Sequence, residues 1–571
     1  MPAPKLKMRL GDLLVNKNII THEQLMQALN TQKSTGRKLG DTLIELGFLT
    51  EKQLLEFLAQ QLDVPFLDIS QKRILPEVAK LLPEVHARRL RALVIEDQGD
   101  SVLLGMSDPA DLNALDQLEQ MLAPKKIKLA AVMESQLFEA FDNLYRRTAD
   151  IESFASQLED EYEQSSDFDL GAAFGDEAGD ATVGKLLQSI FEDAVQMRAS
   201  DIHIEPDENQ LRIRQRIDGL LQESILKENR IASAMVLRLK LMAGLDISEK
   251  RLPQDGRFNL KVKGHEIDVR MSTMPVQHGE SVVMRLLDQT AGILSFSETG
   301  MPADLIARLR HQITRPHGMI LVTGPTGSGK TTTLYAALSE LNQASNKIIT
   351  AEDPVEYRLP RVNQVQINHK INLTFSTILR TALRQDPDII MVGEMRDQET
   401  VEMGLRGALT GHLVLSTLHT NDAITSALRL MDMGAAGFLV GSALRAIIAQ
   451  RLVRRICGNC KEIYQADEQE LFWLSNLIGD SAKNTVYYKG KGCQSCQYTG
   501  YKGRIGVFEL LELNTAMMQA LKQGDAETFA KYANENEGFT PLAHAAFDYA
   551  KQGIISVEEV LRLVETVDVA G

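Results

Sequence analysis

The chain has 571 residues, a formal net charge of −15 and a charged content of 24%. This length exceeds what one hydrophobic core supports and predicts roughly three to five domains. An apolar content of 44% indicates neither a fibrous nor a wholly disordered protein, and the chain has no basic excess that would favour nucleic-acid binding.

The first seventy residues carry one short pattern twice, 29 residues apart: RLGDLL at 9–14 and KLGDTL at 38–43. The segments Thr21–Gln24 and Thr50–Gln53 both match a capping box, and leucines four residues apart then follow on one helix face. The glycine in each copy permits a close backbone approach. On these residues alone, the pattern predicts a small helical repeat that packs on itself and serves for docking.

Residues 71–145 alternate apolar segments (ALVIED, SVLLGM and IKLAAVM) with helical stretches, which predicts a small α+β unit. We therefore expect an N-terminal module over 1–145, with a helical part (1–70) and an α+β part (71–145). Residues 148–180 contain eleven acidic residues and no Lys or Arg. This composition predicts an acidic flexible linker over 146–182.

A phosphate-binding loop is predicted at 324–332. The apolar run 319–322 is typical of a buried strand, and it leads into GPTGSGKTT and then the helix-like TLYAALSEL. This is the strand, loop and helix that the motif G-x-x-x-x-G-K-[ST] requires. Lys330 would reach the β- and γ-phosphates, and the Thr331 hydroxyl would hold Mg²⁺. The expected ATP-binding residues are Gly324, Pro325, Thr326, Gly327, Ser328, Gly329, Lys330, Thr331 and Thr332.

Three further segments surround this loop in the sequence. A second strand-like run, 388–392, ends just before Glu394, which could hold Mg²⁺ or orient the attacking water. IITAEDPVEY (348–357) carries carboxylates that either serve the site or form a salt-bridged loop, and TGHLVLSTLHTND (410–422) carries histidines that are either core residues or γ-phosphate sensors. Periodicity does not decide these alternatives. The residues concerned are Glu352, Asp353, Glu356, His412 and His419.

The only cysteines form two C-x-x-C pairs, and four thiolates suffice for a closed tetrahedral structural zinc site. A redox role for the pairs is the alternative. No uncharged apolar run reaches the ~18 residues that span a bilayer, and the N-terminus lacks a signal-peptide pattern, so we expect a cytoplasmic protein. The expected zinc ligands are Cys457, Cys460, Cys493 and Cys496.

From about residue 183 to 510 the chain resembles the secretion ATPases of type II secretion and type IV pilus assembly. The resemblance rests on six segments in family order: ASDIHIEP, RLPQDGR, GPTGSGKTT, AEDPVEY, RQDPDIIMVGEMRD and TGHLVLSTLHTND. It implies a multidomain α/β fold and a hexameric ring. The domains implied are a PAS-like domain (183–295), a RecA-like ATPase core (300–455), a zinc-binding tetracysteine region (456–500), which pilus retraction ATPases lack, and a helical C-terminal region (501–571).

The resemblance also implies roles for single residues. Glu394 is the main catalytic carboxylate, with Thr331 as the other Mg²⁺ ligand, and Glu352 assists. Arginines would place positive charge around the transferred phosphoryl group, although each taken singly could be a surface or ion-pair residue. They are Arg270, Arg285, Arg380, Arg384 and Arg396.

The N-terminal repeat resembles the MshEN domain, which binds cyclic di-GMP, so a duplicated motif would match a ligand with two guanines. Lys38 stands where the pattern has Arg and loses its planar stacking fork, although Arg37 is adjacent; Asn18 replaces a glycine. The contacts implied are Arg9, Leu10, Gly11, Leu14, Leu25, Leu29 and Gln32 in one half and Arg37, Lys38, Leu39, Gly40, Leu54, Leu58 and Gln61 in the other, with Asp41 and Asp108 as weaker candidates.

Together these features predict a cytoplasmic hexameric ATPase that extends a type IV pilus, with the closest resemblance to the extension ATPase of the MSHA pilus. It would use ATP, Mg²⁺ and Zn²⁺, respond to cyclic di-GMP and act on an inner-membrane platform protein. A type II secretion ATPase and a catalytically silent cyclic di-GMP receptor remain as alternatives. A nucleic-acid translocase is less favoured by the charge, and no nucleic-acid partner is expected.

Overall fold

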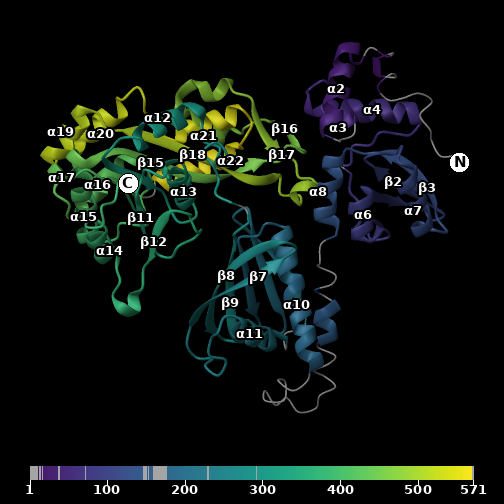
Figure 1. Ribbon diagram of the computed structural model, residues 1–571, viewed down its shortest axis with the longest axis horizontal. Coiled ribbons are helices and arrows are strands. Elements are labelled where there is room, and N and C mark those ends of the chain that lie inside the picture. Colours follow the sequence, from purple (N-terminus) through teal and green to yellow (C-terminus); the bar gives the residue numbers. More distant parts are fainter. Residues whose placement is uncertain are drawn as a thin grey trace.

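The computed structural model describes residues 11, 14, 15, 17, 19–35, 39–70, 72–145, 151, 153–158, 177–227, 231–290 and 292–568. Figure 1 shows three bodies: an N-terminal module, a middle domain that contains α10 and α11, and a motor domain that contains the C-terminal helices. Within the described ranges, no helix has the length and apolar composition required to cross a bilayer.

The N-terminal repeat forms helices α2 (His22–Thr35), α3 (Leu39–Glu45) and α4 (Glu51–Leu62). Both predicted capping boxes are confirmed, because Thr21 and Thr50 each exchange hydrogen bonds with the glutamine three residues later. The predicted close approach of the glycines is also confirmed. A Cβ atom on Gly11 would lie 2.6 Å from Leu25 Cδ1, and one on Gly40 would lie 2.8 Å from Leu54 Cδ2. The two copies therefore pack in the same way.

The rest of the module is the expected α+β unit. Its sheet has the order β1-β2-β3, with β1 and β2 antiparallel and β2 and β3 parallel, and the three apolar segments form these strands. Glu51, at the start of α4, accepts hydrogen bonds from the backbone of Glu134 (2.6 Å) and the hydroxyl of Ser135 (3.1 Å). The elements are α5 (Pro76–Ala79), α6 (Glu84–Leu90), β1 (Ala92–Asp97), β2 (Ser101–Met106), α7 (Leu112–Leu122), β3 (Lys126–Ala131) and α8 (Glu134–Leu144).

The middle domain is an antiparallel sheet in the order β6-β5-β4-β9-β8-β7, packed against α10 and α11. Part of the predicted flexible linker belongs to this domain, so the linker prediction is wrong there: residues 153–158 and 177–182 are helical, and Ile151, Ala155 and Leu158 are buried in its core. Their spacing is that of one helix face, which the acidic composition concealed. The elements are α10 (Glu177–Gln196), β4 (Asp201–Pro206), β5 (Leu211–Ile217), β6 (Leu220–Leu226), α11 (Ile231–Met242), β7 (Gln254–Val262), β8 (His265–Val276) and β9 (Gly279–Asp288).

The motor domain is built on a seven-stranded sheet in the order β12-β11-β13-β14-β10-β15-β18. All pairs are parallel except β15 with β18, and the predicted strands before the phosphate loop and before Glu394 are confirmed as β10 and β13. The elements are α12 (Ala303–Ile313), β10 (Gly318–Thr323), α13 (Lys330–Leu341), β11 (Ile348–Glu352), β12 (Val362–Gln366), η2 (His369–Ile371), α14 (Phe375–Ala382), β13 (Ile389–Val392), α15 (Gln398–Leu409), β14 (Leu413–Leu418), α16 (Ala423–Asp432), α17 (Gly437–Ala443) and β15 (Leu444–Ile456).

The C-terminal region differs from the all-helical prediction at its start. Residues 501–512 form β18, which runs antiparallel to β15 at the edge of the motor sheet. Its second half is buried in the sheet, and its apolar run reads equally well as helix or strand in the sequence. The elements are β16 (Lys461–Tyr464), α18 (Glu468–Ile478), η3 (Gly479–Asn484), β17 (Tyr487–Gly490), η4 (Gln494–Cys496), β18 (Tyr501–Glu512), α19 (Thr515–Gln523), α20 (Ala526–Asn534), α21 (Leu542–Lys551) and α22 (Val557–Asp568).

The close packing of α17 on α19 yields a stability prediction. A Cβ atom on Gly441 would lie 2.5 Å from the Met518 carbonyl oxygen, so overpacking in Gly441→Ala should reduce the free energy of unfolding by about 1–3 kcal/mol and lower the thermal unfolding midpoint. Gly184 in α10 has open space around it, so Gly184→Ala should leave the midpoint unchanged or raise it. Differential scanning calorimetry checks both, and an unchanged midpoint in Gly441→Ala would contradict this packing.

Candidate functional site

The phosphate loop joins the buried strand β10 to the N-terminus of α13. Gly329, the N-cap of α13, has φ +90°, a value that favours glycine. Gly324 also has positive φ, and a Cβ there would lie 2.5 Å from both the Gln450 carbonyl oxygen and Ser328 Oγ. The loop is therefore shaped by glycines and opens onto a helix N-terminus, an arrangement that binds anions.

Lys330 folds back over this loop. Its Nζ donates hydrogen bonds to the carbonyl oxygens of Gly324 (2.8 Å) and Pro325 (3.1 Å). Burial lowers the pKa of Lys330 to about 8; Glu394 opposes this shift, and the positive charge of Arg451 adds to it. A phosphate group would replace the carbonyl contacts and favour the charged form of the lysine.

Glu394 lies just after β13 and is held by two side chains. Arg396 Nε lies 2.6 Å from Glu394 Oε2, and His419 Nε2 lies 3.1 Å from Glu394 Oε1. Burial and the nearby charge of Lys330 lower the pKa of His419 and so favour the neutral ring, although Glu394 opposes this shift. The carboxyl ends of β10, β13 and β14 meet at one edge of the sheet, which brings Lys330, Glu394 and His419 together.

Glu352 has a different environment, because it is buried at the end of β11 and its oxygens are taken up by protein donors. Tyr335, on α13, donates its hydroxyl to Glu352, as do the Thr350 hydroxyl (2.5 Å) and the Gln364 amide (3.1 Å). The backbone of Glu356 donates to the same Tyr335 hydroxyl (3.3 Å). Glu352 therefore ties the helix of the phosphate loop to the acidic segment.

The other carboxylates of the acidic segment take part in ion pairs. Arg270, on β8 of the middle domain, makes a two-pronged contact with Glu356, with nitrogen–oxygen distances of 3.1 and 2.5 Å. Asp353 lies 3.4 Å from Arg396 and 3.7 Å from His369. Asp353 and Glu356 therefore have the contacts of a salt-bridged loop. The Arg270–Glu356 pair also joins the middle domain to the motor domain.

The remaining arginine candidates lie in other ion pairs or hydrogen bonds. Arg285 is 3.2 Å from Asp201 in the middle domain, Arg380 pairs with Glu399, and Arg384 donates to the Arg380 carbonyl oxygen (2.9 Å). None of the contacts recorded for the described part of the chain brings these three side chains to the phosphate loop.

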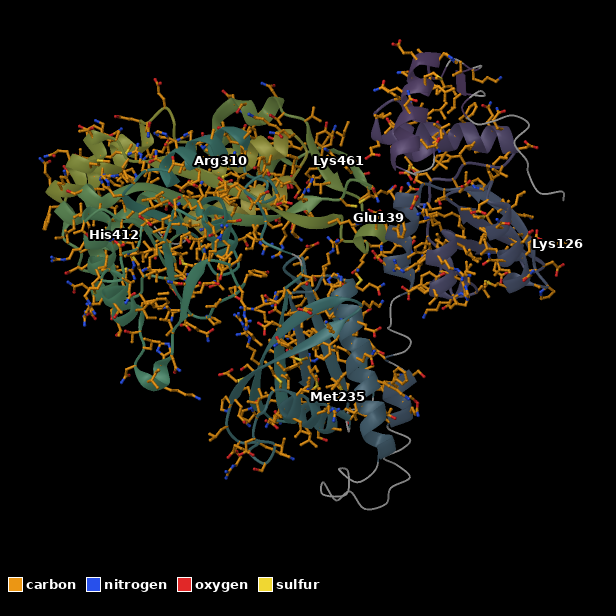
Figure 2. All side chains as sticks on the ribbon, in the orientation of Figure 1. Lys126, Glu139, Met235, Arg310, His412 and Lys461 are labelled. Atoms are coloured by element: carbon orange, nitrogen blue, oxygen red, sulfur yellow. The ribbon has the colours of Figure 1, made fainter. Side chains whose placement is uncertain are left out.

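His412 and His419 lie at opposite ends of β14. His412 precedes the strand, and its Nδ1 lies 2.9 Å from the Gly407 carbonyl oxygen. Its own carbonyl oxygen accepts from Gly318, at the start of β10 and therefore at the end of that strand away from the phosphate loop. Figure 2 labels His412 in the motor domain. Of the two histidines, only His419 reaches Glu394.

Two side chains that the motifs did not reveal support the nucleotide site. Gln450, on β15, accepts from the Thr333 hydroxyl (2.7 Å) and donates to the Ser328 carbonyl oxygen (2.8 Å), so it clamps the phosphate loop to α13. The sequence did contain a signal for Gln450, because it interrupts the mostly apolar run LRAIIAQRLV and a buried amide requires hydrogen-bond partners. Tyr335, which holds Glu352, had no such signal, because it lies on a helix that carries other apolar residues.

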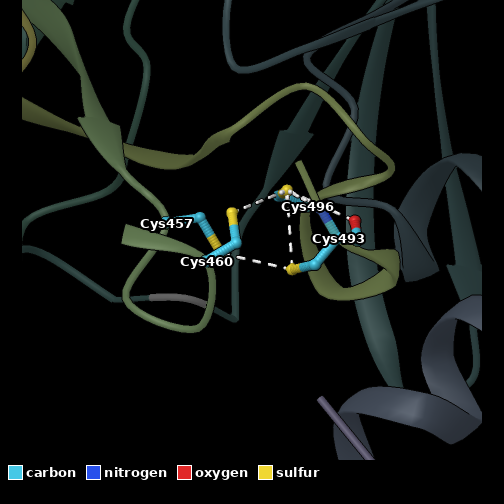
Figure 3. A group of neighbouring side chains, drawn as sticks. All are labelled: Cys457, Cys460, Cys493 and Cys496. Atoms are coloured by element: carbon cyan, nitrogen blue, oxygen red, sulfur yellow. Dashed lines mark hydrogen bonds between the residues drawn. The ribbon is translucent and has the colours of Figure 1, made fainter. Parts of the chain in front are cut away.

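The four cysteines converge on one point (Figure 3). Their Sγ atoms all lie within 4.8 Å of one another, with separations of 3.8 Å for Cys457–Cys493 and Cys460–Cys496 and 3.7 Å for Cys493–Cys496. A tetrahedron with metal–sulfur bonds of about 2.3 Å has edges of about 3.8 Å. Backbone N–H groups, such as that of Gly500 (3.3 Å from Cys496 Sγ), also donate to the sulfurs. The group therefore fits one closed structural metal site.

The N-terminal repeat places its two copies around a shared apolar cluster. Leu25 and Leu54 are buried against the glycines of their own copies, and Leu39 of the second copy also lies beside Gly11 of the first. Asp108 lies between β2 and α7 and accepts from the Ala110 backbone (3.3 Å). Of the expected ligand contacts, Leu14, Leu29, Leu58, Gln32 and Gln61 are also described; Arg9, Leu10, Arg37, Lys38, the departure Asn18 and the side chain of Asp41 lie outside the described residues.

Comparison with known proteins identifies the family. A family model described as "Type II/IV secretion system protein" matches residues 176–562, more than half of the chain. The chain belongs to this secretion ATPase family. An MshEN domain model matches residues 62–151 in the N-terminal module.

Relatives of the secretion ATPase include proteins of both pilus and secretion machines. The type IV pilus assembly ATPase PilB of Myxococcus xanthus is 40% identical over 559 residues, covering 97% of this chain and 98% of the relative. The type II secretion system ATPase E of Vibrio cholerae is 43% identical over 455 residues, covering 79% and 88%. A solved structure described as "Structure of MshE with cdg" is 54% identical and covers 24% of this chain and 100% of that chain, with a TM-score of 0.24.

This secretion ATPase therefore combines an N-terminal MshEN module with a RecA-like motor domain that hydrolyses ATP. The family implies ATP and Mg²⁺, and the structure places the glycine loop, Lys330 and Glu394 at one edge of the sheet. The cysteine cluster is compatible with zinc.

The lowered pKa of Lys330 predicts a pH dependence of nucleotide binding. Free protein loses the lysine proton as the pH rises through about 8, whereas bound phosphate favours the protonated form. Binding therefore takes up a proton above this pH, and the Kd for ATP should rise by up to about tenfold per pH unit. Isothermal titration at pH 7, 8 and 9 measures this.

Lys330→Arg is the matched control, because a guanidinium stays protonated over this range. It should bind ATP more weakly but with little change between pH 8 and 9. Equal slopes for the two proteins would show that Lys330 does not titrate in the free site.

Proposed function

We propose that the chain is a cytoplasmic hexameric motor that powers extension of a type IV pilus of the MSHA kind through an inner-membrane platform protein, under control of cyclic di-GMP. The observation that carries the pilus assignment is the end-to-end match with PilB, 40% identical over 97% of this chain. The MshEN match and the duplicated repeat support the regulatory part.

In the proposed cycle, the backbone N–H groups of the phosphate loop and Lys330 hold the β- and γ-phosphates. Thr331 and Glu394 would hold Mg²⁺, which neutralises charge on the phosphate oxygens when bound. Glu394 orients the attacking water, and the neutral ring of His419 keeps that carboxylate in place. Glu352 acts by fixing α13 through Tyr335.

Arginines outside this centre would supply positive charge to the transferred phosphoryl group after a domain movement. Release of the Arg270–Glu356 pair would free Arg270, and ring assembly would bring arginines of one subunit to the nucleotide of another. Positive charge around the transferred phosphoryl group stabilises its transition state. Further candidates for this supply are Arg285, Arg380, Arg384 and Arg396; of these, Arg396 is paired with Asp353, as Arg270 is with Glu356, and each would have to leave its carboxylate.

For cyclic di-GMP, the support is the repeated geometry of the N-terminal helices. In each copy a glycine packs closely against a leucine. A Cβ atom on Gly11 would lie 2.6 Å from Leu25 Cδ1, and a Cβ atom on Gly40 would lie 2.8 Å from Leu54 Cδ2. Two equivalent backbone surfaces suit a ligand with two equivalent guanines, with Arg9 and the Arg37–Lys38 pair as the stacking cations. Asp41 and Asp108 would accept guanine N–H bonds.

For the cysteines, we propose a structural zinc ion. The sulfur separations match a tetrahedral site with no open position, which favours structure over catalysis and over redox exchange.

Glu394→Gln tests the motor assignment. The amide keeps the size of the side chain but loses the charge that holds Mg²⁺ and orients water, so ATP turnover should fall about 100-fold or more while ATP binding persists. Glu340→Gln, which removes a carboxylate paired with Arg310, should retain turnover. Steady-state phosphate release measures both, and normal turnover in Glu394→Gln would refute the assignment.

Gln32→Ala tests the dinucleotide site, with Gln27→Ala on the same helix as its matched control. Loss of a hydrogen bond to the ligand should weaken cyclic di-GMP binding about tenfold in the first variant and leave it unchanged in the second. Lys38→Arg should tighten binding by restoring a planar stacking cation. Calorimetry on the full chain measures all three, and ATPase rates with and without the dinucleotide test regulation. Without saturable binding below high micromolar concentration, only the docking role of the repeat would remain.

A type II secretion ATPase is the second candidate, because the Vibrio cholerae relative is also close in sequence. Expression of the chain in strains that lack either relative separates the two. Restored pili in Myxococcus xanthus would support the proposal, whereas restored secretion in Vibrio cholerae would favour the alternative.

A further inference from the structure

One carboxylate of the N-terminal module is held by the tetracysteine region. Glu139, on α8, accepts hydrogen bonds from Asn459 Nδ2 (2.7 Å), Ser495 Oγ (3.0 Å) and Lys502 Nζ (2.8 Å). Figure 2 shows Glu139 at the edge of the N-terminal module, facing the motor domain. Asn459 lies between Cys457 and Cys460, and Ser495 lies between Cys493 and Cys496. Both cysteine loops therefore supply a donor to the same side chain.

The same loops make a second contact with the module. The Gln494 side chain lies against the Ile74 backbone. Gln494 Oε1 accepts from the Ile74 N–H, and Gln494 Nε2 donates to the Ile74 carbonyl oxygen, both at 3.5 Å. Of the four residues enclosed by the two cysteine pairs, three thus face the module: Asn459, Gln494 and Ser495. Only Gly458 takes no part in these contacts.

The contact is ionic and only partly shielded from water. Burial disfavours the charged form of Glu139, but the hydrogen bonds from Lys502, Asn459 and Ser495 outweigh it and leave its pKa below the ordinary value. The side chains of Glu139 and Lys502 remain 37% and 45% exposed. A cavity of about 600 Å³ lies beside the contact, lined by residues that include Phe138, Met197 and Tyr501, one from each body. An interface of this kind can open without exposing an apolar core.

We propose that the tetracysteine region is the docking site for the N-terminal module, and that the metal holds its two loops in the position that binds α8. With the sulfurs 3.7 to 3.8 Å apart, Asn459 and Ser495 converge on one carboxylate. Backbone hydrogen bonds already join the two segments, from the Cys457 N–H to the Gly500 carbonyl oxygen and from the Lys491 N–H to the Cys460 carbonyl oxygen (both 2.9 Å), and the metal would in addition tie the four sulfurs together and so fix the enclosed residues that face α8. The cysteine site then serves as a receptor for the regulatory module as well as a local structural element.

The dock lies on a continuous route between the two ligand sites. Glu51 joins the start of α4, which carries part of the repeat, to the start of α8. Glu139 joins α8 to the cysteine loops, and the first loop follows directly on β15, the strand whose Gln450 clamps the phosphate loop. The regulatory meaning of this route rests on the proposed function; the docking itself does not.

Hydrogen–deuterium exchange of the full chain tests the dock. Glu139→Lys places like charges together, so the backbone of residues 134–144 and 493–503 should exchange about tenfold faster. Glu119→Lys, the same charge change at an exposed position of α7, should leave this exchange unchanged. The double variant Glu139→Lys with Lys502→Glu should restore protection. Unchanged exchange in Glu139→Lys, or no restoration in the charge swap, would overturn the proposal.

Metal removal tests the role assigned to the cysteines. Metal release by a chelator, followed with a zinc-sensitive dye, should deprotect residues 134–144 in the unaltered chain, although Glu139 is intact. Continued protection of α8 in the stripped protein would overturn the metal's part in docking. Cyclic di-GMP binding, measured on the same variants, should persist in Glu139→Lys. Absence of dinucleotide binding in the unaltered chain would count against the proposed function. Unchanged hydrogen exchange in Glu139→Lys would instead count against the dock.

Discussion

The register of three neighbouring parallel strands is the constraint on which the ATP site depends. β10 pairs with β14, and β14 pairs with β13, so that Thr323, Leu418 and Val392 end at one edge of the sheet. The next residues after these strand ends are the phosphate loop, His419 and Gly393 with Glu394. A one-residue slip in either pairing would displace the carboxylate from the loop by about 3.3 Å, which would prevent joint contact with one phosphate group.

β15 extends this constraint to the rest of the chain. It pairs in parallel with β10 on one side and antiparallel with β18 on the other, and its central residue Gln450 holds the phosphate loop. The same strand ends at Ile456, immediately before the first cysteine pair. Because a strand buried in a sheet moves as a unit, a displacement of the cysteine loops would act on both β15 and β18.

The sequence predicted features whose residues lie close together in the chain. The strand, loop and helix around Lys330, both capping boxes and the close approach at the glycines of the repeat are local features, and the structure has them. Contacts between distant segments were not accessible: the Tyr335–Glu352 bond and the Arg270–Glu356 pair depend on how strands and domains pack against one another. The prediction of a linker was wrong around residues 153–158, because the acidic composition concealed the apolar helix face formed by Ile151, Ala155 and Leu158. β18 was missed because a short apolar run fits a helix as well as a strand.

The three bodies have separate apolar cores and meet through polar contacts. Arg270 joins the middle domain to Glu356 of the motor, and Glu139 joins the N-terminal module to the cysteine loops. Water reaches both joints, because Arg270 and Glu356 are 22% and 25% exposed and Lys502 and Glu139 are 45% and 37% exposed. Burial of an apolar interface of similar extent would instead oppose separation through the hydrophobic effect. The polar character of both joints therefore allows the bodies to change their arrangement during a nucleotide cycle while each core stays packed.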